Sequence, residues 1–270
     1  MGGTECFVIG DWRLKIENFY KWVIALAMIV GALPFVNNAR AYAGEHVGLT
    51  YGFSARMQNA YLWRGIRNGG LNMQIDANVG YGGLYADMWW NIGATDWAFT
   101  KFQPEVDLSV GFNRWGLNVY LLYIYNFNTG FFDGRNYVGK GNRLEFNFRY
   151  TPSQRVPIGI VWATRIAASD GYRNAKGKVK RAYSSYAEVN YTQPLPYGLS
   201  IGAAVGLTPW RSCYTSYERN FALNNIDLRL RKDWTVHERL GMMVMAQMAV
   251  NPYFHKDVIH LNAALGIYLK

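Results

Sequence analysis

The chain has 270 residues, of which 50% are hydrophobic, 16% are aromatic and 17% are charged. Soluble domains usually carry about 25% charged residues, and this composition excludes a disordered, collagen-like or coiled-coil chain. The formal net charge is +10, and the 2 cysteines exclude a disulfide-rich scaffold or a multi-cysteine zinc site.

The N-terminal segment has the features of a secretory signal peptide. Its longest apolar run, residues 22–36, is shorter than the about 20 residues that a membrane-spanning helix needs. Two lysines precede this run, and Ala41-Tyr42-Ala43 follows it with small residues at both cleavage positions. We therefore expect cleavage after residue 43, which leaves residues 44–270 as a single domain. A short anchor helix is the alternative interpretation.

From residue 44 onwards the dominant period is two, which is typical of β-strands because successive side chains point to opposite faces. Between residues 143 and 150, for example, Phe146 and Phe148 share one face, and Glu145 and Arg149 share the other. The expected strands are 47–58, 72–79, 84–92, 105–112, 116–125, 143–150, 158–166, 183–191, 199–207, 225–230, 235–250 and 261–269.

The joints between these strands alternate between short and long. The short ones, which are rich in turn residues, are 82–83, 113–115, 151–157, 193–198 and 231–233. The long ones are 64–70, 94–104, 126–141, 167–181, 209–220 and 251–257. Strict alternation predicts an all-β, up-and-down antiparallel β-barrel of about 12 strands, with tight turns at one rim and loops at the other. Strands of about 10 residues also match the length of a tilted transmembrane strand.

The polar face of each strand decides between a membrane barrel and a soluble lipocalin-like barrel or sandwich. It carries Gly, Ser, Asn, Asp, Glu and Arg, which cannot fill a dry core without a prohibitive desolvation cost. We therefore expect this face to line a wet lumen and the apolar face to contact lipid. Aromatic residues near strand ends are typical of interfacial girdles; they are Tyr61, Trp63, Trp90, Trp115, Tyr125, Tyr150, Tyr191 and Trp234.

The run Asn59-Ala60-Tyr61-Leu62-Trp63-Arg64-Gly65-Ile66 resembles the Asp-Tyr-Val-Phe-Arg-Gly-Ile opening of the TorF/Gcw_chp porin family. As in that family, a hairpin at residues 74–91, the acidic run Glu105-Val106-Asp107 and a Tyr-rich strand follow. The resemblance covers the first third of the mature chain. It implies an outer-membrane barrel with channel function. The C-terminus departs from the usual pattern of such barrels, because it ends on lysine instead of an aromatic residue.

Two motifs look catalytic but lack the context that catalysis needs. Residues 198–202 match G-x-S-x-G, yet they open a strand where a nucleophile elbow requires a strand, a turn and a helix. Residues 134–141 contain G-x-x-x-x-G-K, yet Gly141 stands where Ser or Thr binds magnesium. None of the 4 histidines has metal-ligand spacing. We expect no enzyme, metal or cofactor; a lipid hydrolase built on Ser200 or His260 is the alternative.

Charged residues on the polar face are the candidates for a selectivity site, because rings of charge at a constriction select permeating ions. They are Arg56, Asp76, Asp87, Glu105, Asp107, Arg143, Glu145, Arg165 and Glu188. The alternative is that these groups neutralise one another, because a 12-stranded lumen is narrower than that of the porins with 16–18 strands.

With the N-terminus in the periplasm, the long loops face outside, and these loops are basic. Arg64 and Arg67 are expected at this outer rim, and its densest candidates for binding anions are Arg173, Lys176, Lys178, Lys180 and Arg181. A basic rim raises the local concentration of anions, so lipopolysaccharide phosphates and anionic solutes are expected partners; ordinary solvation is the alternative. The chain shows no nucleic-acid-binding module.

These features together predict a passive outer-membrane channel for small hydrophilic solutes, with anionic solutes as a candidate class. Two alternatives come from other classes. One is the barrel hydrolase acting on lipid, and the other is a non-conducting barrel that serves as an adhesin or anchor.

Overall fold

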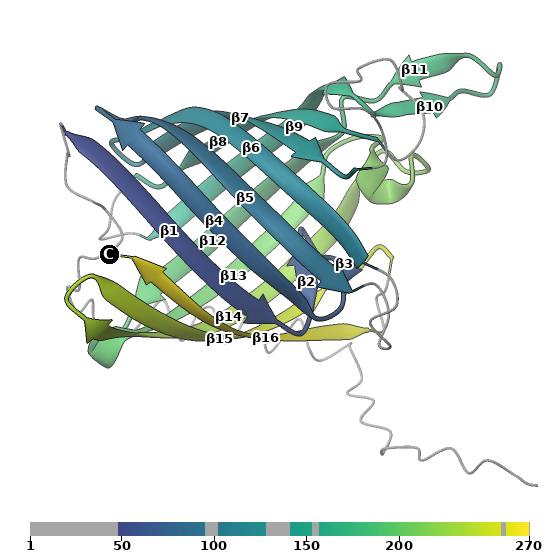
Figure 1. Ribbon diagram of the computed structural model, residues 1–270. Coiled ribbons are helices and arrows are strands. Elements are labelled where there is room, and N and C mark those ends of the chain that lie inside the picture. Colours follow the sequence, from purple (N-terminus) through teal and green to yellow (C-terminus); the bar gives the residue numbers. More distant parts are fainter. Residues whose placement is uncertain (1–47, 95–101, 128–140, 153–156, 255–257, 270) are drawn as a thin grey trace, which may run out of the picture. The chain divides into compact units, whose positions relative to one another are not determined.

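The computed structural model describes residues 48–94, 102–127, 141–152, 157–254 and 258–269. In these ranges, strands close into an antiparallel barrel in the order β1-β16-β15-β14-β13-β12-β9-β8-β7-β6-β5-β4 (Figure 1). The barrel strands are β1 (Leu49–Gln58), β4 (Asn72–Tyr81), β5 (Leu84–Ala94), β6 (Phe102–Arg114), β7 (Leu117–Tyr125), β8 (Arg143–Tyr150), β9 (Ile158–Ala168), β12 (Ser185–Pro194), β13 (Leu199–Thr208), β14 (Ala222–His237), β15 (Leu240–Val250) and β16 (Ile259–Leu269). The prediction of a barrel with 12 strands is confirmed. The predicted signal peptide lies outside the described residues.

The barrel closes because its first and last strands pair. In this pairing Met57 of β1 lies opposite Leu265 of β16, and β1 pairs on its other side with β4. Every barrel strand therefore has two neighbours, so the sheet leaves no open edge. A membrane requires this, because hydrocarbon offers no water to pair with free backbone N–H and C=O groups.

The two faces of the sheet have opposite chemistry. Phe146 is 38% exposed and Leu265 is 52% exposed on the outer face, whereas the Glu145 side chain is 0% exposed inside. Trp115, Tyr150 and Trp234 are exposed near the short-turn end, as an interfacial girdle requires. The predicted assignment of the apolar face to the outside is confirmed.

One predicted turn is wrong. The sequence analysis ended a strand at residues 231–233, but β14 continues to His237 and the chain turns at Glu238 and Arg239. The backbone of β14 keeps pairing with β15 through this segment, with Asp233 opposite Met243 and Thr235 opposite Gly241. Arg231 and Asp233 lie two residues apart on one face, where Arg231 donates from Nε and Nη2 to the carboxylate of Asp233, each at 2.7 Å, so the charged residues fit within the strand.

The long joints contain short elements that the alternation did not predict. The first holds the hairpin of β2 (Tyr61–Trp63) and β3 (Ile66–Gly69), and another holds the hairpin of β10 (Gly171–Arg173) and β11 (Val179–Arg181). Two single-turn 3-10 helices, η1 (Pro196–Gly198) and η2 (Cys213–Thr215), complete the elements. No helix in the described ranges is long and apolar enough to cross a membrane.

The orientation of the strands predicts unequal effects for neighbouring substitutions. Val189 is 56% exposed on the outer face of β12, and Asn190 faces the lumen beside Glu188. Val189→Arg places a charge in lipid and should lower the free energy of unfolding by about 2–4 kcal/mol, whereas Asn190→Arg should change it by much less. Urea unfolding of protein refolded into lipid vesicles measures both values. Equal losses for the two variants would contradict the assignment of the faces.

Candidate functional site

The β2–β3 hairpin folds into the mouth of the barrel. The Tyr61 hydroxyl donates to Glu105 Oε1 of β6 at 2.8 Å, and the Tyr61 ring lies 5.4 Å from that of Trp89 on β5. Farther along the hairpin, Arg64 contacts Glu145 on β8. Because the hairpin contacts side chains on the lumen face of three strands, it lies inside the lumen.

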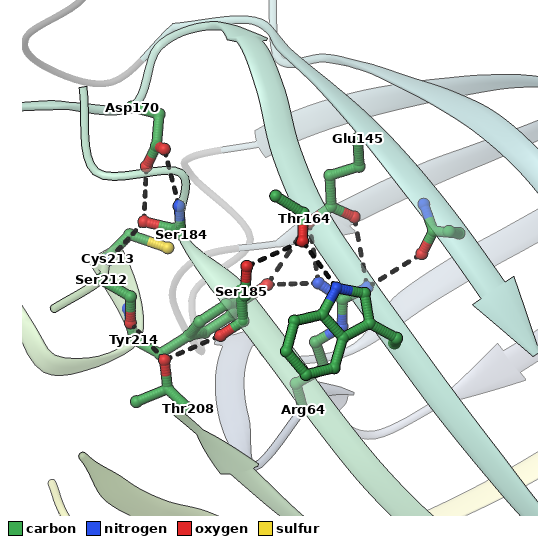
Figure 2. Close-up of polar contacts among 12 residues, drawn as sticks. Arg64, Glu145, Thr164, Asp170, Ser184, Ser185, Thr208, Ser212, Cys213 and Tyr214 are labelled. Atoms are coloured by element: carbon green, nitrogen blue, oxygen red, sulfur yellow. Dashed lines mark hydrogen bonds and ion pairs between the residues drawn. The ribbon is translucent and has the colours of Figure 1, made fainter. Parts of the chain in front are cut away.

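Arg64 anchors this hairpin through a buried, bidentate ion pair (Figure 2). Its Nη1 donates to Glu145 Oε2 at 2.8 Å, and its Nη2 donates to Glu145 Oε1 at 3.2 Å and to Asn147 Oδ1 at 3.3 Å. The side chains of Arg64 and Glu145 are 9% and 0% exposed. Two parallel charge-assisted hydrogen bonds fix both position and orientation. Removing one partner of such a pair typically costs about 3–5 kcal/mol, because the other charge stays buried.

Aromatic rings enclose the Arg64 guanidinium. Its central carbon lies 4.3 Å from the ring of Trp63, 5.0 Å from that of Tyr186 and 5.7 Å from that of Tyr214. These distances are within the range of cation–π attraction. Arg64 also donates to the Tyr214 hydroxyl. Burial raises the pKa of Tyr214, so this hydroxyl is neutral at physiological pH.

Tyr214 comes from a second loop, between β13 and β14, that also enters the mouth. A chain of polar contacts holds this loop (Figure 2). The backbone N–H of Cys213 donates to Ser184 Oγ at 2.8 Å, and Ser184 Oγ donates to Asp170 Oδ1 at 2.5 Å. Ser212 Oγ accepts from the backbone N–H of Tyr214 at 3.2 Å and caps η2. These contacts hold Tyr214 against Arg64, so two loops together narrow the mouth.

A glycine lets the hairpin tip approach the opposite wall. Gly65 has a φ of +76°, and a Cβ atom there would lie 1.9 Å from the backbone oxygen of Asn224 on β14. Any other residue would be strained by its φ and would also clash with the strand backbone.

Several of the predicted lumen candidates have partners on the polar side of the sheet. Arg56 Nε donates to Gln74 Oε1 at 2.6 Å, and Asp87 Oδ2 accepts from Ser109 Oγ at 3.2 Å. The fold gathers Glu105, Arg143, Glu145 and Arg165 near the mouth, whereas Arg56, Asp76, Asp87 and Glu188 lie elsewhere on the wall. Asp107 Oδ1 is buried without a hydrogen-bond partner among the described residues.

Three predictions about the first loop are wrong. Arg64 was expected at the outer rim, but it is buried in the lumen. Tyr61 and Trp63 were expected in a lipid-facing girdle, but Tyr61 bonds to Glu105 and Trp63 packs 5.9 Å from the ring of Tyr214. The sequence did carry one signal for a packed loop. Two rings, an arginine and a glycine occur within five residues, and loops of this composition pack against other elements.

Beneath the hairpin the lumen widens into a chamber of about 390 Å³. The hairpin tip (residues 62–65) lines one side, and Thr151 and Thr192 lie toward the short turns. Charged side chains of both signs face this space: Arg149, Glu188, Asp227 and Arg229. The sequence analysis included only Glu188 of these four. We call this space the lumen chamber.

The β10–β11 hairpin carries the predicted basic cluster and extends beyond the barrel (Figure 1). Arg173, Lys176, Lys178 and Lys180 are exposed, and Arg181 donates to the backbone oxygen of Ala168 at 3.3 Å. No acidic residue occurs from Gly171 to Arg181. The hairpin is therefore a projecting surface of uniformly positive charge.

The G-x-S-x-G motif lacks the strand, turn and helix of a nucleophile elbow. Ser200 lies at the start of β13, opposite Arg231, and the strand continues to Thr208 without a helix after it. His260 lies on β16 opposite Ala249. Within the described ranges no group of three or more His, Cys, Asp or Glu residues could hold a metal ion. Residues 134–140 lie outside the described residues.

A closed sheet with an apolar exterior and a polar lumen defines the class of transmembrane β-barrels. No family model and no curated protein matches the chain, so the resemblance to the TorF/Gcw_chp family stays a prediction.

Three solved structures are similar to this chain at low sequence identity. "KdgM porin" is 6% identical, with 81% of this chain and 98% of that chain covered and a TM-score of 0.44. OmpF of Salmonella typhi, solved with daunomycin, is 10% identical, with 84% and 99% covered and a TM-score of 0.36. The COG4313 outer membrane channel from Pseudomonas putida F1 is 8% identical, with 85% and 99% covered and a TM-score of 0.44.

The close approach at Gly65 predicts how the hairpin can be released. Gly65→Ala should push the tip away from β14 and expose the bond after Arg67, so trypsin should cleave there about tenfold faster, as expected for a loss of about 1.4 kcal/mol. Gly177→Ala is the matched control, because Gly177 has a φ of +73° with open space around it. Similar cleavage rates after Arg67 in both variants would show that the tip is not packed in the lumen.

Proposed function

We propose that the protein is an outer-membrane channel for small hydrophilic solutes, with a mouth that two inserted loops hold narrow. The observation that carries this proposal is the polar chamber of about 390 Å³ below the Arg64–Glu145 pair, inside a barrel with an apolar exterior. A structural barrel has no need for an unfilled polar interior. The Arg64–Glu145 pair then sets how far the mouth opens.

A preference for anions belongs to the same proposal. Near the mouth, Arg64, Arg143 and Arg165 are balanced by the three carboxylates Glu105, Asp107 and Glu145. The outer loops have no such balance, since the β10–β11 hairpin is only basic. The rim therefore attracts anions before they reach the lumen. In this arrangement the N-terminus is periplasmic and the long loops face outside.

The enclosed state of Arg64 favours one competing function, a non-conducting barrel that anchors the exposed hairpin at the cell surface. Conductance separates the two functions. Purified protein in planar lipid bilayers should show discrete single-channel currents if the barrel is a channel. A sealed bilayer for both the wild type and the variant below would overturn the channel and favour the anchor.

Removal of the Arg64 anchor should open the mouth. Arg64→Ala leaves Glu145 buried without its partner, and the hairpin should leave the lumen to relieve that cost. Single-channel conductance should rise severalfold above the wild type. Arg67→Ala is the matched control, because Arg67 lies on the same hairpin but is exposed, with its Nε donating to the backbone oxygen of Gly69 at 3.4 Å. An unchanged conductance in Arg64→Ala would refute the role of Arg64 as the anchor.

We also infer that the β10–β11 hairpin contacts the phosphates of lipopolysaccharide. Its tip is ordered, because Asn174 Oδ1 accepts from the backbone N–H groups of Lys176 and Lys178 at 3.0 Å and 2.9 Å. The lysines therefore project from a defined turn. In the outer leaflet the anions nearest to these lysines would be the lipid phosphates. Each lysine–phosphate pair would release counterions from the lipid surface, and this release favours binding.

Neutralisation of the tip tests this contact. The triple variant Lys176→Gln, Lys178→Gln and Lys180→Gln should bind lipopolysaccharide vesicles about tenfold more weakly at low salt, and the difference should shrink as salt screens the charges. Ala175→Gln, a neutral change at the same tip, should bind like the wild type. Vesicle co-sedimentation measures both. If the triple variant binds these vesicles as strongly as the wild type, the hairpin does not contact the phosphates and its lysines are only solvated.

A further inference from the structure

Two opposite charges face the lumen chamber at the same level of the barrel. Arg149 of β8 and Glu188 of β12 both line this space, and each lies directly opposite Val161 of β9, the strand between them. Residues that lie directly opposite each other in an antiparallel sheet point to the same face. Neighbouring strands are about 4.8 Å apart, so the two Cα atoms are separated by roughly 10 Å. The two charges therefore flank one apolar side chain.

Neutral groups hold the Glu188 carboxylate in place. Its Oε2 accepts from the Tyr186 hydroxyl at 2.5 Å and from Asn225 Nδ2 at 3.4 Å, and its Oε1 accepts from Asn190 Nδ2 at 3.1 Å. A carboxylate has about four acceptor positions, so these donors leave room for one more. None of the three donors is charged, so they fix the carboxylate without neutralising it.

Arg149 is accessible to a solute from the opposite side. Its side chain is exposed and lines the chamber, and it forms no ion pair with a residue in the described ranges. Its guanidinium carbon lies 5.3 Å from the Tyr120 ring, within the range of cation–π attraction. Two further charges of the chamber pair with each other, because Arg229 Nε lies 2.6 Å from Asp227 Oδ1. The chamber thus keeps one positive and one negative group that are balanced in number but separated in space.

A solute that carries both charges fits this arrangement better than a solute that carries one. An anion would be attracted by Arg149 and repelled by Glu188, and a cation would meet the reverse. A zwitterion with its carboxylate toward Arg149 and its ammonium toward Glu188 is attracted by both groups. Each of these charge-assisted hydrogen bonds spans about 2.8 Å, so the spacing of the two strands leaves room for a solute whose charged groups are a few bonds apart.

We propose that the lumen chamber is a binding site for small zwitterions of the α-amino-acid type, in which Arg149 binds the carboxylate and Glu188 binds the ammonium. The chamber's volume of about 390 Å³ lies within the about 300–1,000 Å³ of small-molecule sites. The basic β10–β11 hairpin acts on solutes outside the barrel, whereas this pair acts on solutes that have entered. The inference names a solute class for the proposed channel and rests on that function for its biological use.

Serine and its two singly charged fragments test the proposal. The anion 3-hydroxypropanoate is serine without the ammonium, and the cation ethanolamine is serine without the carboxylate. Calorimetric titration of the full chain, folded in detergent micelles at neutral pH, compares the three solutes. L-serine should bind at least about tenfold more tightly than either fragment, which corresponds to about 1.4 kcal/mol.

Two variants should change the selectivity in opposite directions. Glu188→Gln should weaken serine binding about tenfold and strengthen the binding of 3-hydroxypropanoate, because it removes the repulsion of anions. Arg149→Gln should weaken serine binding to a similar extent and strengthen the binding of ethanolamine. A merely structural role for either residue would instead weaken the binding of all three solutes together. Arg173→Gln, on the exposed hairpin, should bind serine like the wild type.

Each result decides the proposal. It is overturned if the wild type binds 3-hydroxypropanoate or ethanolamine as tightly as serine, if both variants keep full serine binding, or if the variants lose all three solutes equally. Arg149→Gln keeps the test valid if Glu188→Gln fails to fold, because the Arg149 side chain is exposed. Conductance is measured separately. Serine binding without single-channel currents would support this site and overturn the channel, whereas currents without serine binding would support the channel and overturn this site.

Discussion

The structure depends on one constraint: a backbone surrounded by hydrocarbon must satisfy all its hydrogen bonds within the protein. The barrel meets it by the pairing of β1 with β16, which leaves no strand with a free edge. Closure then divides the side chains by strict alternation. Residues such as Phe146 contact the apolar surroundings, and residues such as Glu145 face inward. A polar interior is thus a direct result of a closed sheet in lipid, and a channel can only be built from what fills that interior.

In this barrel the interior is partly filled by the chain itself. The β2–β3 hairpin and the η2 loop meet at Arg64, where an ion pair with Glu145 and three rings hold them together. Below them the chamber stays open, with Arg149 and Asn225 on its walls. The contrast between the two arginines is informative. Arg64 is paired with Glu145 and acts as a structural anchor, whereas Arg149 lines the chamber and forms no ion pair with a residue that the structure describes.

The sequence was sufficient to predict the barrel, because the alternation of apolar and polar residues is repeated in each strand. A strand in lipid must alternate along its whole length, so Phe146 and Phe148 on one face and Glu145 on the other all indicate the same orientation of the strand. The same alternation separates Glu145, whose side chain is 0% exposed, from the exposed Phe146. It failed where charges interrupt a strand without ending it, as at Arg231 and Asp233, whose side chains pair with each other at 2.7 Å.

The alternation pattern could not predict the contacts of the loops. The partner of Arg64 lies 81 residues away, and no periodic pattern connects the two. The cluster of rings beside Arg64 indicates a packed loop, but it does not identify Glu145 as the partner of Arg64, whose side chain is 9% exposed, whereas Arg67 on the same hairpin is exposed. Arg149, Asp227 and Arg229 were not among the candidates either, because only the fold shows which inward-facing charges meet around one space.

The distribution of Arg64's contacts along the chain has a consequence for assembly. Arg64 follows the first barrel strand, Glu145 lies on β8, and Tyr214 precedes β14. The guanidinium can reach all its partners only after most strands have taken their places around a common axis. The full set of contacts around Arg64 therefore requires that β8 and the loop before β14 are both in place.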